Sequence, residues 1–385
     1  MIRFTTAGES HGESLLVILE GIPAGLAVNY KDIDLDLARR QKGYGRGKRM
    51  SIETDVVKIL SGMRHLRTLG SPIAMSIANR DFQNWVNKMS PTSSECDDKP
   101  LLRPRPGHAD LPGLIKYNVK DFRDILERAS ARETAARVAA GAVCKILLKE
   151  FDIGIMSYTS QIGDIVADIS SIKEGKLLYD TEVSKVRCPD TVASKKMIEL
   201  VDKARLQGDT LGGKVVVVVK DVPAGLGSHT QWDLKLDGRL AQSLISIQAV
   251  KAVEFGDGTK LAENFGSVSH DEIFYSNAKW FYRKTNRAGG IEGGMSNGEP
   301  IVVTCTMKAI PSLANPLHSV NLVTKRTAKA EAVRSDICAV PAVGVVAEAA
   351  VAIELAKALK EKFGGDSLED MKKNVNTYKE RLKAL

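Results

Sequence analysis

The sequence has little cysteine, few aromatic residues and no long apolar run, and each shortage excludes a class of protein. The five cysteines are scattered without a CxxC spacing, so we expect reduced, mostly buried thiols and neither a zinc site nor a disulfide framework. No apolar run approaches the ~20 residues of a membrane-spanning helix. The first residues, MIRFTTAGESHGE, lack the apolar core of a signal peptide. We therefore expect a cytoplasmic protein without membrane attachment.

The chain of 385 residues carries a formal net charge of +8, which raises the question of polyanionic partners. Aromatic residues make up only 5% of the chain and do not interleave with basic residues as on RNA-recognition surfaces. Many arginines instead lie next to glycine, proline or histidine in expected turns. This favours pockets for small anions and no nucleic acid. The alternative is a nucleic-acid-binding protein without catalysis, whose binding would fall steeply with salt.

Arginines gather between residues 103 and 137, where a helix is expected to begin. Ser130 and Glu133 have the spacing of a capping box, in which the Ser130 hydroxyl accepts from the first turn and Glu133 reaches back to the Ser130 N–H. The alanine-rich helix should run to about Glu150. Its N-terminus suits an anion, and the surrounding arginines add full charges. A solvated basic helix end is the alternative interpretation.

Two histidines lie beside glycines in expected turns. His11 stands in the motif GESHG before a strand, and His108 stands in RPGHAD, in a loop stiffened by prolines. Glycine lets a ligand approach the backbone, and imidazole exchanges protons near neutral pH, so this pattern suits acid catalysis on a phosphorylated or carboxylated substrate. The alternative is a structural turn histidine, which we expect of His65, His229, His270 and His318.

Two glycine-rich stretches and one acidic residue are further candidates. RRQKGYGRGKRM (39–50) is neither a P-loop nor a dinucleotide-binding turn, but it could fold over an anionic substrate. A solvent-exposed basic loop or contact with a nucleic-acid backbone are its alternatives. NRAGGIEGGMSNG (286–298) would cradle a phosphate or a flat ring, or form a tight hairpin. Asp336, shortly before the last long helix, is a candidate base or a helix cap.

An internal repeat organises the chain. Residues 12–26 and 212–226 align without a gap at an offset of 200 and share Pro-Ala-Gly-Leu, and GSPI at 70–73 is echoed by GEPI at 298–301. A helix-like segment follows each Pro-Ala-Gly-Leu, so three matches in the same order predict an internal duplication. We expect one domain, 1–385, with halves of about 1–150 and 205–365 and a helix or tail at 366–385.

The elements expected from periodicity place helices between sheets. Strands are expected at 15–19 and 72–77, and helices at 32–41 and 342–363. The last helix is almost continuously apolar and should be buried. The fold class predicted is α+β.

Together, eight motifs resemble the chorismate synthase family, in the family's order from about Ile2 to Phe363: GESHG, RRQKGYGRGKRM, RPGHAD, ERASARETAARVAAGA, SIQAVKAVEFGDG, NRAGGIEGGMSNG, KAIPS and RSDICAVPA. The resemblance implies a carbon–oxygen lyase of the shikimate pathway. It would convert 5-enolpyruvylshikimate 3-phosphate into chorismate and phosphate by anti-1,4-elimination. The resemblance also implies reduced FMN as cofactor without net oxidation, the flavin giving electron density as phosphate leaves and recovering it as the C6 hydrogen is removed.

The resemblance further implies a β-α-β sandwich, with a helical core between antiparallel sheets and internal pseudo-symmetry, assembled as a homotetramer. Some members also reduce their own flavin with a nicotinamide nucleotide and carry insertions, whereas this chain is near the shorter length. We therefore expect a monofunctional enzyme that receives reduced FMN from an external reductant. A flavin reductase is a further alternative, and it would oxidise a nicotinamide nucleotide in the presence of FMN.

Site roles follow from the positions that match the family's motifs. His11 would donate a proton to the leaving phosphate, His108 would contact the pyrimidine edge of the reduced flavin, and Asp336 would be the base acting with flavin N5. The substrate's phosphate and carboxylates would be bound by Arg40, Arg46, Arg49, Arg132 and Arg334. The flavin would contact Arg128, Ala129, Ser130, Gln248, Ala249, Gly293, Lys308, Ala309, Ile310, Pro311, Ser312 and Arg334. Lys308 would also help with flavin or substrate oxygens, and no metal is expected.

Overall fold

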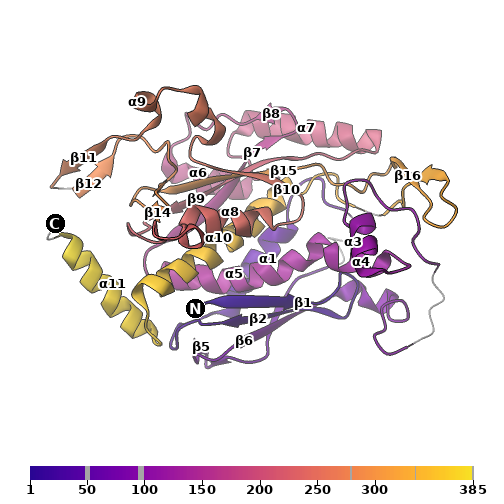
Figure 1. Cartoon of the computed structure of the whole chain (residues 1–385), viewed down its shortest axis with the longest axis horizontal. Helices are drawn as coiled ribbons and strands as arrows, with labels where there is room; N and C mark the ends of the chain where they lie inside the picture. The colour runs from indigo at the N-terminus through magenta and orange to yellow at the C-terminus, as the bar shows by residue number, and fades with distance from the viewer. Residues whose placement is uncertain (48–52, 94–98, 278–279, 334, 384–385) are drawn as a thin grey trace.

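Two long helices run through the centre of the computed structural model, which describes residues 1–47, 53–93, 99–277, 280–333 and 335–383. These helices, α5 (Thr134–Lys149) and α10 (Val340–Phe363), pack against each other (Figure 1). α5 contacts a four-stranded sheet, and α10 contacts a five-stranded sheet. The α+β class predicted from the sequence is confirmed.

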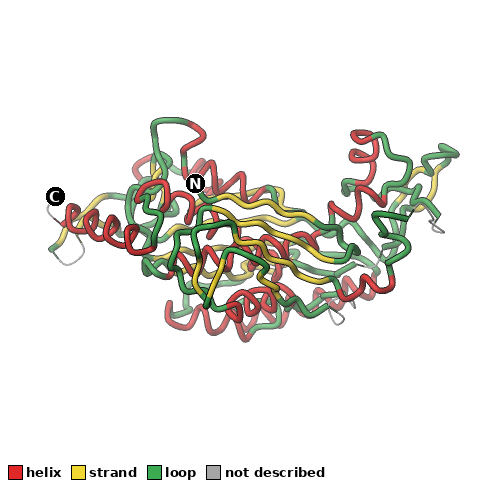
Figure 2. Tube along the Cα trace, turned by 90° about the horizontal axis from the view of Figure 1, so that it is seen from below, coloured by secondary structure: helices red, strands yellow, loops and turns green. Residues whose placement is uncertain are grey.

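The four-stranded sheet is antiparallel, in the order β1 (Arg3–Ala7), β2 (Ser14–Glu20), β6 (Ile73–Ala78) and β3 (Val57–Ile59). Side chains alternate along β2: Leu15, Val17 and Leu19 are buried, whereas Leu16 and Ile18 are exposed. This period of two places one face of the strand on the helical core and leaves the other uncovered. Seen from below, the strands run along the length of the molecule (Figure 2).

The five-stranded sheet is antiparallel and has two register irregularities, one in the β10–β15 pairing and one in the β7–β9 pairing. Its order is β10 (Val250–Phe255), β15 (Ile301–Met307), β9 (Gly213–Lys220), β7 (Gly154–Ile162) and β8 (Ile165–Val166). The edge pairing of β10 with β15 matters for the site, because it brings residues 248–249 beside residue 308: the Lys308 N–H donates to the Ala249 carbonyl at 3.0 Å.

The remaining elements surround this core. The helices are α1 (Tyr30–Gln41), α3 (Asp110–Tyr117), α4 (Arg123–Ala129), α6 (Glu174–Val183), α7 (Thr191–Gln207), α8 (Leu236–Ile245), α9 (Gly266–Ser269) and α11 (Leu368–Lys383). The 3-10 turns are η1 (Arg80–Asn84), η2 (Ala131–Glu133), η3 (Trp232–Leu234) and η4 (Gly258–Glu263). The short hairpins are β4 (Met63–Arg64) with β5 (Arg67–Thr68), β11 (Ile273–Ser276) with β12 (Trp280–Arg283), β13 (Ile291–Glu292) with β14 (Met295–Ser296), and β16 (His318–Val320) with β17 (Thr327–Lys329).

Several sequence predictions are confirmed by these elements. The expected strands and helices correspond to β2, β6, α1 and α10, and most side chains of α10 are buried, as its apolarity predicted. Four cysteines, Cys144, Cys188, Cys305 and Cys338, are buried free thiols, and burial raises the pKa of each to about 11 or about 12. Cys96 lies outside the described residues. In the described part of the chain, no helix has both the length and the apolarity to span a bilayer.

The two Pro-Ala-Gly-Leu turns are held by the same hydrogen bonds. In the first, the Thr68 hydroxyl accepts from the Leu26 N–H at 3.0 Å and donates to the Pro23 carbonyl at 2.6 Å. In the second, the Ser296 hydroxyl accepts from the Leu226 N–H at 2.8 Å and donates to the Pro223 carbonyl at 2.7 Å. Each hydroxyl belongs to the second strand of a hairpin whose strands are two residues long. This strand is β5 for Thr68 and β14 for Ser296.

The contact between α5 and α10 is close at Gly141. A Cβ added there would lie 2.3 Å from the Cβ of Ala349 and 2.5 Å from its Cα, so glycine is needed for the two helices to approach. Gly141→Ala should therefore lower the free energy of unfolding by about 1–3 kcal/mol, the usual cost of overpacking a core. The clash involves backbone as well as side chain, so we expect this cost to exceed the ~1 kcal/mol that alanine gains over glycine in a helix.

Urea unfolding followed by circular dichroism measures this effect. Gly175→Ala is the matched control, because Gly175 lies in helix α6 and an added Cβ would meet no atom within 4 Å. The control should be neutral or up to ~1 kcal/mol more stable. Equal stability of the two variants would contradict the close contact.

Candidate active site

His11 lies in the turn between β1 and β2 and is held by α4. The Glu127 carboxylate, only 1% exposed, accepts from the His11 backbone N–H at 2.8 Å and lies 2.9 Å from His11 Nδ1. The imidazole is stacked on Trp85, with ring centroids 3.9 Å apart. The turn requires glycine at position 8, where φ is +104° and a Cβ would lie 2.3 Å from the Ser14 carbonyl oxygen. The histidine is therefore oriented by backbone, ring and carboxylate contacts.

His108 lies at the start of α3 in a buried ionic cluster. Its Nδ1 is 2.5 Å from Asp110 Oδ1, and Asp110 also accepts from Arg105 Nε at 2.9 Å. Arg105 Nη1 donates to the Ser312 hydroxyl at 2.6 Å, which joins this loop to the segment after β15. Lys308 in the same segment donates to the Gly107 carbonyl. Both sequence-predicted histidines are thus positioned by carboxylates.

Asp110 predicts how stability depends on pH. Burial alone would raise its pKa, but hydrogen bonds from His108 and Arg105 hold the pKa well below the usual range. A carboxylate with a lowered folded-state pKa stabilises the fold fully above the unfolded value of about 4, and this contribution is lost as pH falls towards the folded value.

We therefore expect the free energy of unfolding, from urea titrations, to fall between about pH 5 and pH 2. Asp110→Asn should be less stable than the natural chain at pH 7, and its stability should change less over that range. An equally steep fall in the variant would show that Asp110 does not contribute.

A third group combines three arginines with carboxylates. Arg132 Nη1 donates to Asp55 Oδ1 at 2.5 Å, and Arg40 lies 3.9 Å from Asp55. Arg46 Nη1 lies 2.9 Å from Asp336 Oδ2, and the Gly47 N–H donates to Asp336 at 2.6 Å.

Two of these arginines are buried and each has a nitrogen without a hydrogen-bond partner among the described residues. Burial lowers the pKa of Arg40 to about 10; Asp55 opposes this effect and the charges of Arg132 and Arg46 add to it. Among the described residues, Arg40 Nε and Arg132 Nη2 are buried donors without a hydrogen-bond partner. Arg132 Nη2 lies 3.6 Å from Glu53 Oε2, and Asp55 Oδ2 is a buried acceptor without a hydrogen-bond partner in the described part of the chain. Buried polar atoms are normally satisfied, so the cluster has hydrogen-bonding capacity for a further ligand such as an anion.

Hydrogen bonds connect most of the predicted flavin residues to one another and to the clusters around His11 and His108. Arg128 donates to the Gly8 and Thr6 carbonyls, and the Thr6 hydroxyl donates to Glu133 at 2.8 Å. Gln248 donates to Glu133 at 3.4 Å. Residues 248–249 adjoin Lys308 through the β10–β15 edge, and residues 308–312 reach the His108 cluster through Lys308 and Ser312. Ala129 and Ser130 join α4 to η2.

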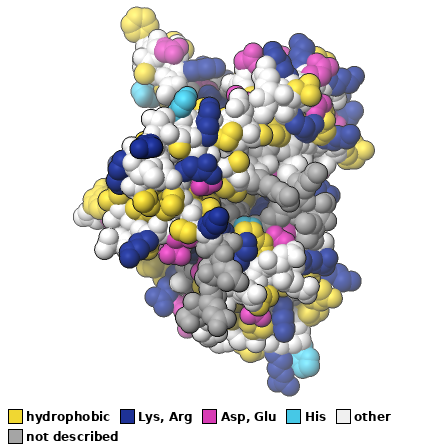
Figure 3. Space-filling view, turned by 90° about the vertical axis from the view of Figure 1, so that its right-hand side faces the viewer, with side chains coloured by type: hydrophobic (Ala, Val, Ile, Leu, Met, Phe, Trp, Pro, Cys, Tyr) yellow, Lys and Arg dark blue, Asp and Glu magenta, His cyan; other side chains and the backbone are white. Residues whose placement is uncertain are grey.

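One described residue, Gly293, falls outside this region. Gly293 turns the β13–β14 hairpin, and Figure 1 shows β14 towards the opposite end of the molecule from α3. Arg49 and Arg334 lie outside the described residues. The end that carries α3 and α4 faces the viewer in Figure 3, and Lys and Arg side chains are spread over it.

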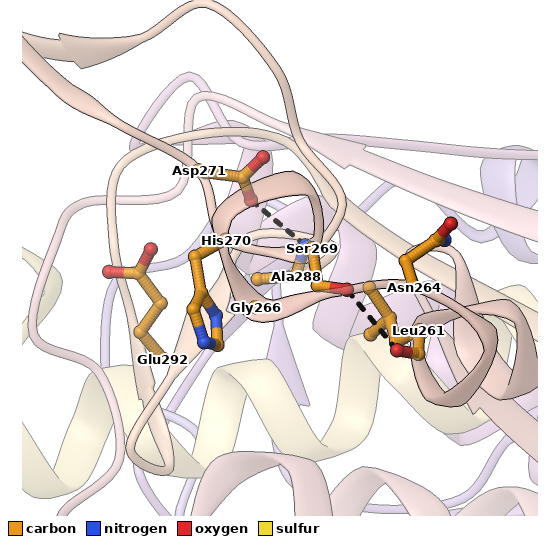
Figure 4. Close-up of a pocket in the computed structure, with 8 residues that line it drawn as sticks. All are labelled: Leu261, Asn264, Gly266, Ser269, His270, Asp271, Ala288 and Glu292. Atoms are coloured by element: carbon orange, nitrogen blue, oxygen red, sulfur yellow. Dashed lines mark hydrogen bonds between the residues drawn. The ribbon is translucent and has the colours of Figure 1, made fainter.

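Two cavities are lined by other residues of the chain. One, of about 490 Å³, is lined by residues 261–292 around α9, with Asp271 accepting from the Ala288 N–H at 2.9 Å (Figure 4). The other, of about 410 Å³, is lined by Arg39, Lys42, Gly43, Tyr44 and residues 182–187. Neither contains a predicted site residue.

One of the two hydrogen bonds predicted for the capping box is formed. The Ser130 hydroxyl accepts from the Arg132 N–H at 3.3 Å, as predicted. Glu133 does not return to the Ser130 N–H; its carboxylate accepts from Thr6, Arg137 and Gln248. Thr6 and Gln248 from two other segments, together with Arg137 one turn along the helix, replace the local partner. The helix starts through η2 before α5.

An α+β body with two oriented histidines and a group of buried arginines and carboxylates is typical of an enzyme that acts on a small molecule. The sequence model of the chorismate synthase family matches residues 2–359. Chorismate synthase of Endomicrobium trichonymphae is 79% identical over 385 residues, covering 100% of both chains. That of Desulforudis audaxviator (strain MP104C) is 53% identical, covering 100% of this chain and 99% of the relative. A crystal structure of chorismate synthase matches with a TM-score of 0.81 and 42% identity, covering 100% of this chain and 99% of the other.

The chain belongs to the chorismate synthase family. It is a lyase, and its place is in aromatic amino acid biosynthesis.

Proposed function

We propose that this site converts 5-enolpyruvylshikimate 3-phosphate into chorismate and inorganic phosphate by anti-1,4-elimination. The cluster of Arg40, Arg46 and Arg132 carries this proposal, because Arg40 Nε and Arg132 Nη2 are buried donors without a hydrogen-bond partner among the described residues. The substrate has one phosphate and two carboxylates, and guanidinium groups are the side chains best suited to bind both. Arg49 and Arg334 are proposed substrate ligands on the resemblance alone.

The side chains divide the proton transfers between them. His11 donates a proton to the leaving phosphate from Nε2, because its Nδ1 faces the Glu127 carboxylate. Asp336 is the base that acts with flavin N5 when the C6 hydrogen is removed. Arg46 and the Gly47 N–H hold its carboxylate in place. Asp110 and Arg105 fix the orientation of His108.

Reduced FMN fits the region formed by residues 128–130, 248–249 and 308–312. The Gln248 amide oxygen is a buried acceptor without a hydrogen-bond partner in the described chain, which suits a ring N–H. Arg128 and Lys308 supply positive charge for the cofactor's phosphate. Burial, with a contribution from Lys251, lowers the pKa of Lys308. When bound, the reduced flavin supplies electron density to the substrate ring during elimination, and His108 would contact its pyrimidine edge. We propose a monofunctional enzyme that relies on an external reductant.

We also propose a homotetramer in the cytoplasm. Apolar side chains are exposed on the outer face of the four-stranded sheet, at Leu16 and Ile18, and on the β11–β12 hairpin, at Ile273, Tyr275 and Phe281. Apolar exposure of this kind is typical of surfaces that bind another subunit. The Gly293 hairpin lies away from the rest of the flavin region within one chain, so its assignment stays a prediction from the resemblance.

We infer further that the chain is one sandwich-like domain built by duplication, with halves of about 1–150 and 205–365. The strand orders β1-β2-β6-β3 and β7-β9-β15-β10 correspond position by position, with a Pro-Ala-Gly-Leu turn after the second strand of each. β7 (Gly154–Ile162) lies in the segment between the two halves and completes the second set of strands. The equivalent hydrogen bonds of Thr68 and Ser296 support this inference. Each set of strands is followed by a long central helix, α5 or α10.

An anaerobic assay tests the proposed reaction. Protein with photoreduced FMN and the substrate should form chorismate and phosphate, and oxidised FMN should support none. No product with reduced FMN would reject the proposal. Oxidation of a nicotinamide nucleotide by the purified protein with FMN would instead favour the flavin reductase hypothesis. A salt-sensitive gel shift at physiological ionic strength would favour nucleic-acid binding.

A further inference from the structure

Glu127 contacts His11 in two ways and is buried beneath it. Its Oε2 accepts from the His11 backbone N–H at 2.8 Å, and both of its oxygens lie within hydrogen-bond distance of Nδ1, at 2.9 and 3.0 Å. Its own backbone carbonyl accepts from the Ser10 N–H at 3.0 Å. Glu127 comes from α4, 116 residues away in sequence, so this arrangement depends on the docking of α4 against the turn after β1.

The position of the carboxylate determines which ring nitrogen does chemistry. A carboxylate accepts hydrogen bonds and cannot donate them when ionised, so Nδ1 must carry a hydrogen. The proton that moves is then carried by Nε2. The Glu127 side chain is 1% exposed, and in the described part of the chain no lysine or arginine is ion-paired with it. The buried carboxylate is therefore directed at the backbone N–H and the ring of His11.

Trp85 restricts the remaining freedom of the ring. Its indole is stacked on the imidazole at 3.9 Å with an interplanar angle of 23°. The indole is itself anchored, because Trp85 Nε1 donates to Asp81 Oδ2 at 3.2 Å. With the hydrogen bond at Nδ1 and the indole against one face, rotation of the imidazole would break both contacts.

We propose that Glu127 is a positioning residue, which holds His11 with its hydrogen on Nδ1 so that Nε2 is the nitrogen that transfers the proton, while Trp85 fixes the plane of the ring. This rests on the proposed role of His11 as the proton donor. Glu127 touches neither the reacting atoms nor the proton that is transferred. It acts through His11, so its replacement should change kcat only when His11 is present.

Glu127→Gln keeps the size of the side chain and removes its charge. We expect kcat to fall roughly 10- to 100-fold, part of the ~10²-fold or more that a general acid supplies, with little change in KM for the substrate. In a His11→Ala background, Glu127→Gln should cause no further loss, because the two residues act as a unit. Glu369→Gln, on the exposed part of α11, is the matched control and should leave kcat unchanged.

Additive losses in the double variant would overturn the proposal, as would a Glu127→Gln enzyme with natural kcat. If His11→Ala itself turns over normally, the proposed function of His11 fails separately, and if the natural enzyme makes no chorismate, the reaction itself is wrong.

Nitrogen NMR of the natural protein, labelled with isotopic nitrogen in histidine, shows which ring nitrogen of His11 carries a hydrogen. The signal is assigned by its loss in His11→Ala. The test therefore remains decisive if Glu127→Gln does not fold. Hydrogen on His11 Nδ1 is the expected result. A neutral ring with its hydrogen on Nε2 alone would overturn the proposal.

Discussion

Replacing His11 or His108 by alanine is expected to reduce kcat by ~10²-fold or more, the contribution of a positioned acid or base. For His11, the loss follows from removal of the proton donor held by Glu127 and Trp85. For His108, it follows from loss of the ring that Asp110 and Arg105 orient towards the proposed flavin region. Anaerobic steady-state kinetics with reduced FMN measure both effects.

His229→Ala provides the control, because His229 is exposed and has no proposed role. It should turn over at the natural rate. The thermal unfolding midpoint of each variant should be measured alongside, so that loss of activity is not loss of the fold. Near-natural turnover by both His11→Ala and His108→Ala would remove both role assignments while leaving the family membership intact.

Replacing Glu348 by alanine should lower the free energy of unfolding by about 3–5 kcal/mol, the usual cost of removing one partner from a buried ionic group. Glu348 lies in α10 and is fully buried. It accepts hydrogen bonds from four side chains on three other elements and one loop: Arg39, Lys145, Ser157 and Arg187. Burial alone would raise its pKa, but the charges of Lys145 and Arg39 hold the pKa well below the usual range.

The physical reason is that, among the described residues, three cations share this cluster with two other carboxylates, Asp36 and Glu182. Without Glu348, positive charge would be left uncompensated in the protein interior. Glu361→Ala is the comparison, because Glu361 also belongs to α10, in its last turn, and pairs with Arg239 at the surface. That variant should lose only about 0–1 kcal/mol. Urea unfolding that shows similar small losses for both variants would mean that water reaches the Glu348 cluster.

Prediction from the sequence succeeded where the information is local or repetitive. The alternation of buried and exposed residues predicted β2, and continuous apolarity predicted the burial of α10. The two histidine motifs were found because glycine beside histidine in a turn is visible in a few consecutive residues. The family followed from eight such stretches taken together.

The partners of those residues were not predictable in the same way. Asp110 is two residues from His108 and was within reach of inspection, but Glu127 is 116 residues from His11, and Asp55 is 77 from Arg132. Glu133 was assigned a local cap and instead contacts Thr6, Arg137 and Gln248. Nothing in a short window distinguishes a carboxylate that will meet an imidazole from one that will face solvent.

The sequence by itself therefore determined the elements, the apolar faces that bury and the short motifs that carry chemistry. It did so because helix and strand periodicity and turn geometry depend on neighbouring residues. Only the tertiary structure decided which carboxylate orients each histidine, which arginine donors are left without a partner, and that Gly293 lies away from the other proposed flavin residues. Those outcomes depend on how helices and sheets dock, and side chains distant in sequence meet only once the core between them has packed.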